Sequence, residues 1–126
     1  MTRKLLLIAA LSGFIAVSIG AFGAHAWKVL LIENEGVDMF KTASQYHFIH
    51  TLALLAMVIL SLKITSKYLQ YASYAFALGI ILFSGSLYLM ALLQWTFLGP
   101  VTPIGGLLLL AGWFLIAIAA FKTKLS

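Results

Sequence analysis

The feature that most constrains this chain is a long stretch without charge, since no Asp, Glu, Lys or Arg occurs from Tyr68 to Phe121. As a single helix this stretch would be about 80 Å long, whereas the hydrocarbon core of a bilayer is about 30 Å thick. The chain must therefore turn, and two prolines and a glycine lie within five residues there, at Gly99, Pro100 and Pro103. Because proline breaks a helix interior but fits a first turn, Pro103 is predicted to open a new helix.

Two more apolar runs of membrane-crossing length precede this stretch, at Leu5–Ala24 and Ala43–Leu62. A spanning helix needs about 20 mostly apolar residues, so four helices are predicted, over about 5–24, 43–63, 69–94 and 103–121. Of the 126 residues, 63% are hydrophobic and 9% are charged. That composition excludes a water-soluble domain and a disordered chain. We expect one all-α integral membrane domain over residues 1–126, a four-transmembrane-helix bundle.

The basic residues predict how the bundle is oriented. With four crossings, six of them fall on one side: Arg3, Lys4, Lys63, Lys67, Lys122 and Lys124. The other side has two lysines and three acidic residues: Lys28, Lys41, Glu33, Glu35 and Asp38. The positive-inside rule then places both termini in the cytoplasm. Because the basic residues flank apolar runs and form no patch with exposed aromatics, no nucleic-acid partner is expected.

The outer loop, residues 25–42, is the one long polar segment. Trp27, Leu30 and Leu31 share a helical face there, which is typical of a short helix lying in the membrane interface. An alternative interpretation concerns the start of this loop, since His25 between two alanines resembles a signal-peptide cleavage site. The apolar run before it is longer than a usual signal sequence, so we favour a membrane span.

Small residues mark the expected helix contacts. Helices in lipid associate through close backbone approach and buried polar contacts, because lipid tails are as apolar as the side chains. Five glycines are assigned to such contacts: Gly13, Gly20, Gly79, Gly105 and Gly112. The alternative is that these stripes form a contact between copies of the chain.

Polar side chains within the spans are predicted to gather at one level near the outer leaflet. The candidate cluster contains His25, Tyr46, His47, His50, Ser84, Ser86, Tyr88 and Thr102. Ser12 is assigned to the inner half, and Trp113, in the middle of the fourth helix, is interpreted as packing or lipid-facing bulk.

The cluster has several interpretations. Four are open: an interhelical hydrogen-bond network, a metal site, a haem site, and a pocket for a quinone or lipid to which His and Tyr donate hydrogen bonds. The spans contain no carboxylate and the chain no cysteine. We therefore assign no catalytic residue and no metal ligands, and we expect no cofactor.

Several motifs occur together in a fixed order: residues 20–25 (GAFGAH), Tyr46 with residues 50–53 (HTLA), residues 83–88 (FSGSLY), and residues 102–106 (TPIGG) with Gly112 and Trp113. With this set the chain resembles the YgdD-like family of small bacterial inner-membrane proteins, a domain of unknown function. The resemblance extends over essentially the whole chain. It implies a four-helix, multi-pass protein of the bacterial plasma (inner) membrane, and it implies no activity, substrate or catalytic residue.

Three function classes follow from these observations. The first is a non-enzymatic binding or scaffold protein for a membrane partner or a small hydrophobic ligand. The second is a small oligomeric transporter or channel subunit, which the lack of mid-membrane Asp, Glu, Lys or Arg disfavours. The third is a histidine-dependent metal, haem or quinone site. The lipid bilayer is the expected environment, with a membrane-protein partner or a second copy of the chain as further partners.

Overall fold

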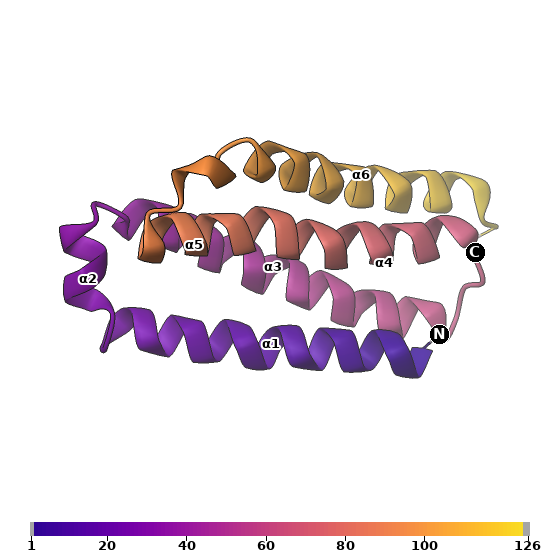
Figure 1. The fold of residues 1–126 in the computed structure, drawn as a ribbon. Coiled ribbons are helices and arrows are strands. Elements are labelled where there is room, and N and C mark those ends of the chain that lie inside the picture. Colours follow the sequence, from indigo (N-terminus) through magenta and orange to yellow (C-terminus); the bar gives the residue numbers. More distant parts are fainter. Residues whose placement is uncertain (1, 125–126) are drawn as a thin grey trace.

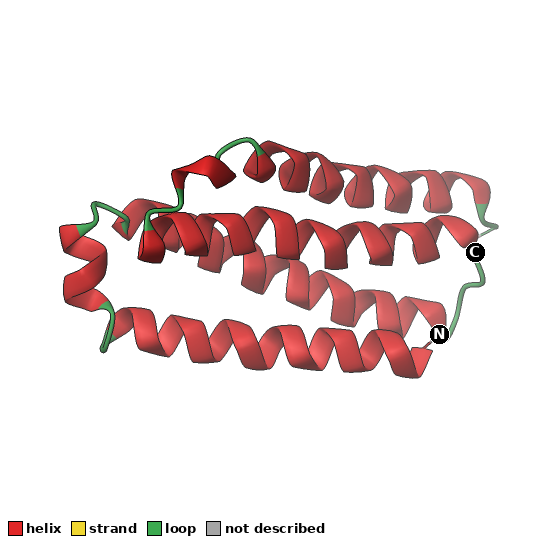
Figure 2. Cartoon of the chain, in the orientation of Figure 1, coloured by secondary structure: helices red, strands yellow, loops and turns green. Residues whose placement is uncertain are grey.

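The computed structural model describes residues 2–124, in which helices are joined by short connections and no strand occurs (Figures 1 and 2). The α-helices are α1 (Thr2–Ala24), α2 (Lys28–Glu33), α3 (Val37–Ser61), α4 (Lys67–Gly79), α5 (Gly85–Leu93) and α6 (Val101–Lys122). Two shorter elements complete the chain: the π-helical turn η1 (Ile80–Ser84) and the 3₁₀ turn η2 (Thr96–Leu98). Because α4, η1 and α5 follow one another without a break, they form one continuous helix, here named the α4–α5 rod.

Four of these helical segments are long and apolar enough to cross a membrane: Thr2–Ala24, Val37–Ser61, Lys67–Leu93 and Thr96–Lys122. This confirms an all-helical chain with four membrane-compatible helices. The segments run antiparallel to their neighbours in sequence, so α1 begins and α6 ends at the same end of the bundle (Figure 1).

The bundle has an inner pair of helices and an outer pair. Helix α1 packs along α3, and α6 packs along α4 and η1, while α3 also contacts every part of the α4–α5 rod. The burial of the four spans supports this division into inner and outer pairs. In the most apolar part of each span, 44% of the residues are buried in α3 and in the rod, against 17% in α1 and 22% in α6. The core between the inner helices contains Phe76 and Leu54, which are fully buried. Helix α1 is therefore held mainly by α3, on one side only.

Helix α3 begins at Val37 rather than at residue 43, because a contact between distant segments ends the preceding loop. The Asn34 side-chain amide donates to the carbonyl oxygens of Ala91 and Leu92, over 3.3 and 3.0 Å. Gly36 lies so close to Ala91 that a Cβ there would be 2.7 Å from the Ala91 carbonyl oxygen. The loop is thus fixed to the last turn of α5, and α3 extends through Asp38 in its first turn.

The glycines differ in how tightly they are packed. A Cβ at Gly79 would overlap Leu109, one at Gly112 would overlap Phe76, and one at Gly105 would overlap the backbone of η1. The glycines of α1 face α3 more loosely. An added Cβ would lie 3.5 Å from Thr51 at Gly13 and 3.9 Å from Phe48 at Gly20, which is ordinary contact. Gly23, in the last turn of α1, is the exception, because a Cβ there would overlap the Phe40 ring. Absence of a side chain is therefore required between α6 and the rod and at the end of α1, but not at Gly13 or Gly20.

Candidate functional site

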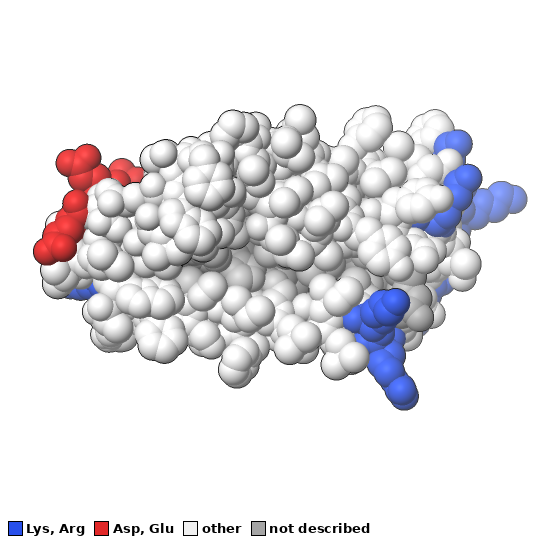
Figure 3. Space-filling view, viewed as in Figure 1, with Lys and Arg blue, Asp and Glu red and all other residues white. Residues whose placement is uncertain are grey.

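A groove opens on the side of the bundle between α1 and the α4–α5 rod, with α3 behind it. Its volume is about 390 Å³, within the range of small-molecule pockets. Figure 3 shows the molecule hollowed here, in an uncharged band between the acidic end and the basic end. We name this cavity the lateral groove. Its lining is mostly aliphatic, with Ile8, Leu11, Ile15 and Ile19 from α1 and Leu54, Ala77, Ile80 and Ile81 from the helices opposite.

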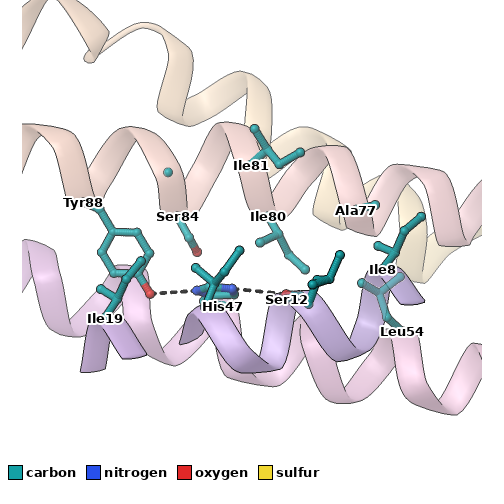
Figure 4. Close-up of a pocket in the computed structure, with 13 residues that line it drawn as sticks. Ile8, Ser12, Ile19, His47, Leu54, Ala77, Ile80, Ile81, Ser84 and Tyr88 are labelled. Carbon is teal, nitrogen blue, oxygen red and sulfur yellow. Dashed lines mark hydrogen bonds between the residues drawn. The ribbon is translucent and has the colours of Figure 1, made fainter. Parts of the chain in front are cut away.

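Polar side chains on the groove wall form one hydrogen-bonded chain (Figure 4). The His47 Nδ1 lies 2.9 Å from the Tyr88 hydroxyl, and its Nε2 lies 3.1 Å from the Ser12 hydroxyl. Ser12 in turn lies 2.6 Å from the Thr51 hydroxyl. The chain Tyr88–His47–Ser12–Thr51 therefore joins α1, α3 and α5 across the groove.

This chain has one proton more than its internal hydrogen bonds use. Neutral His47 supplies one N–H, and the three hydroxyls supply one O–H each, whereas the chain contains three hydrogen bonds. If His47 Nδ1 donates to Tyr88, the Tyr88 O–H is left to donate outside the chain, where the Ser44 side chain competes with a bound acceptor. If Nε2 donates to Ser12, the proton left over is on Ser12 or Thr51. Tyr88 and Ser12 line the groove, whereas Thr51 does not. A bound acceptor can therefore receive the remaining proton from Tyr88 in the first tautomer, or from Ser12 in the second.

His50 is in a different environment, with both ring nitrogens already used. Its Nδ1–H donates to the Tyr46 carbonyl oxygen at 2.8 Å, which leaves Nε2 as an acceptor. The Trp113 indole N–H donates to that Nε2 at 3.0 Å, and the two rings meet edge to face. These bonds define the His50 tautomer and join α3 to α6.

The remaining residues of the predicted cluster lie in separate places. Ser84 donates to the Ala43 carbonyl oxygen at 2.8 Å and joins η1 to α3. Ser86 and Thr102 share a hydrogen bond of 2.6 Å between α5 and α6. His25 is exposed just beyond the end of α1. Within residues 2–124, no group of three or more His, Asp or Glu side chains could hold a metal ion.

The hydrogen-bonded histidines lie nearer the middle of the bundle than the expected outer-leaflet level. Because α3 starts at Val37, His47 and His50 fall near its centre, and Ser12 falls near the centre of α1. Three residues outside the predicted cluster take part, Ser12, Thr51 and Trp113. For Trp113 the sequence contains a usable signal, since an indole N–H in an apolar span needs an acceptor and His50 is one of the few available.

The family described as "Protein of unknown function (DUF423)" matches residues 19–106, from the last turns of α1 into α6. The chain belongs to this family. Three relatives illustrate the similarity. The UPF0382 inner membrane protein YgdD of Escherichia coli (strain K12) is 42% identical over 125 residues, which cover 98% of this chain and 93% of the relative.

The other two relatives are similar over comparable lengths. The UPF0382 membrane protein of Haemophilus influenzae is 39% identical over 124 residues, 98% of each chain. The UPF0382 membrane protein SAB0533 of Staphylococcus aureus is 40% identical over 120 residues, 95% of this chain and 97% of the relative. No solved structure matches the chain. As a DUF423 protein with four membrane-compatible helices, the chain is a multi-pass protein of the bacterial inner membrane, surrounded by the lipid bilayer.

Proposed function

We propose that this protein is a non-enzymatic binding protein for a lipophilic molecule that bears a carbonyl group, such as a quinone. The apolar body of the ligand lies in the lateral groove, against the isoleucines of α1. Its carbonyl oxygen accepts a hydrogen bond from the Tyr88–His47–Ser12–Thr51 chain. The observation that carries the proposal is the surplus proton of this chain, on the wall of an otherwise aliphatic cavity of about 390 Å³.

The depth of the polar chain favours such a ligand over an ordinary membrane lipid. Lipid ester carbonyls lie at the membrane interface, whereas His47 and Ser12 lie near the centres of their helices, and the chain extends from them to Tyr88, nearer the end of the α4–α5 rod. A donor at that depth has only hydrocarbon around it unless a molecule with a buried acceptor enters. Since an unsatisfied polar group in hydrocarbon is unfavourable, the site favours a carbonyl that itself prefers the bilayer interior.

The proposal is tested by titrating the purified protein in detergent with decylubiquinone and following the quenching of tryptophan fluorescence. Tyr88→Phe removes a groove hydroxyl and is expected to weaken binding about fivefold, the usual effect of one hydrogen bond. Ile15→Trp fills the groove and is expected to abolish binding. Ser86→Ala is the matched control, because it removes a hydroxyl that bonds Thr102 outside the groove. Unchanged affinity in both groove variants would refute the proposal.

A transmembrane helix of a partner, or of a second copy of this chain, is the competing occupant of the groove. In that case Ile15→Trp would alter the mass of the complex in size-exclusion chromatography with light scattering. The quinone analogue would then bind neither the variant nor the unmodified protein.

We further propose that both termini are cytoplasmic, so that the acidic end of the bundle faces the periplasm. The charge distribution supports this orientation, because basic side chains gather at the end where α1 begins and α6 ends (Figure 3). The positive-inside rule assigns that end to the cytoplasm.

A further inference from the structure

A second cavity lies where α1, α2 and α3 meet, at the end of the bundle opposite the termini. It also has a volume of about 390 Å³, and it shares no lining residue with the lateral groove. We name it the end pocket. Its position is at headgroup depth, because α1 ends at Ala24 and α3 begins at Val37.

The lining of the end pocket combines positive charge with apolar surface. Lys28 of α2 and Lys41 of α3 both line it and both are exposed. The apolar part includes Leu31 and Phe40, which are buried among their neighbours. Lysine at a membrane boundary extends its ammonium group to the interface while its methylenes stay in apolar surroundings. Two such groups on one apolar pocket are suited to an anion that carries hydrocarbon.

The acidic residues at this end of the bundle do not line the pocket. Glu33, Glu35 and Asp38 are absent from its wall, although Asp38 lies one turn before Lys41 on α3. Figure 3 shows acidic side chains along the upper part and the tip of this end, and a small patch of basic atoms beneath them. The pocket is therefore locally basic even though its end of the bundle carries more acidic than basic residues.

The pocket also has space for a ligand beside α1. A Cβ added at Gly20 would have only the Phe48 ring nearby, 3.9 Å away, so the helix surface there is open. Beyond Gly20 the Phe40 ring closes against Gly23, and the lining continues through Ala24 towards Lys28. An acyl chain can therefore lie against α1 below a headgroup held by the lysines.

We propose that the end pocket binds an anionic phospholipid of the adjacent leaflet, with its phosphate between Lys28 and Lys41 and one acyl chain against Leu31 and Phe40. A free phosphate would leave the apolar lining unused, and a zwitterionic lipid would bring its own cation towards two ammonium groups. Basic pockets between membrane helices bind anionic headgroups by this combination of charge and apolar contact.

The test measures lipid selectivity by native mass spectrometry. The full-length protein is placed in mixed micelles with equal amounts of dioleoylphosphatidylglycerol and dioleoylphosphatidylcholine, and the ratio of the two bound lipids is recorded. We expect the anionic lipid to dominate. Lys28→Gln and Lys41→Gln should each lower the ratio about fivefold. The matched control is the Lys63→Gln, Lys124→Gln double variant, which removes two exposed lysines at the opposite end and should leave the ratio unchanged.

Two further arms complete the test. The Lys28→Arg, Lys41→Arg double variant keeps the charge and should keep the preference, and Gly20→Val narrows the pocket and should reduce bound lipid of both kinds. Millimolar inorganic phosphate should not displace the lipid, whereas displacement would identify a site for a free anion and overturn the proposal. It would also be overturned if the two glutamine substitutions at the pocket and the control pair changed the ratio equally.

Discussion

The adjacent glycines Gly105 and Gly106, in the first turns of α6, provide a direct test of how this bundle is packed. A Cβ at Gly105 would lie 2.7 Å from the Leu82 carbonyl carbon and from the Phe83 Cα, and closer still to the Phe83 backbone nitrogen. A Cβ at Gly106 would lie 3.5 Å from Cδ1 of the Phe83 ring, which is ordinary contact. Gly105→Ala and Gly106→Ala therefore make the same chemical change, and only one of them meets backbone.

The expected effects can be estimated from this difference. Replacing glycine by alanine in a helix interior favours the helix by about 1 kcal/mol, and this gain applies at both positions. Overpacking a tight contact costs about 1–3 kcal/mol, and backbone cannot move aside as a flexible side chain can. We expect Gly105→Ala to lower the free energy of unfolding by about 0–2 kcal/mol, and Gly106→Ala to raise it by up to about 1 kcal/mol.

The measurement is reversible unfolding in mixed micelles, with increasing sodium dodecyl sulfate in dodecyl maltoside, followed by circular dichroism. Because both variants share the host helix and the substitution, differences in the unfolded state largely cancel. Equal free energies of unfolding for the two variants would refute the reasoning, since it would mean that α6 does not approach η1 as closely as the structure describes.

Two further predictions concern the orientation and the indole–imidazole bond. Cysteine introduced at Glu35 should react with an impermeant maleimide in intact cells, and cysteine introduced at Thr65 should react only after lysis. The chain has no native cysteine to interfere. The reverse labelling pattern would mean that the termini lie outside the cytoplasm. Trp113→Phe should lower the free energy of unfolding by about 1 kcal/mol, because it leaves His50 Nε2 without its donor. Trp95→Phe is the control, since that ring is 44% exposed and stacks on a neighbouring phenylalanine; an equal loss in both would assign the effect to the lost indole surface.

The number of membrane-crossing helices followed from local features of the sequence. An uncharged stretch too long for one helix, with prolines near its middle, permits few other arrangements. The start of α3 could not be predicted in the same way, because Gly36 and Asn34 depend on Ala91 and Leu92, which are distant in the chain. The six-residue difference at that boundary also moved the histidines towards the middle of the bundle.

The side-chain pairing within the site was less accessible from the sequence than the list of polar residues. His47, His50 and Tyr88 could be selected because polar groups in apolar spans need partners. Which partners they take depends on helix rotation, and no sequence signal brings Ser12 to His47. His25 is also a histidine, but it lies exposed beyond the end of its helix.

The π-helical turn η1 also determines where this chain can change in length. A π turn holds one residue more than the α-helical turn it replaces, so the α4–α5 rod contains one surplus position within Ile80–Ser84. Loss of a residue there would convert the turn to regular α-helix and keep Phe76 on the side of α6 and Tyr88 on the side of the groove. Loss of a residue elsewhere in the rod would rotate everything beyond it by about 100°. In this family, natural deletions within the third span should therefore be confined to these five positions.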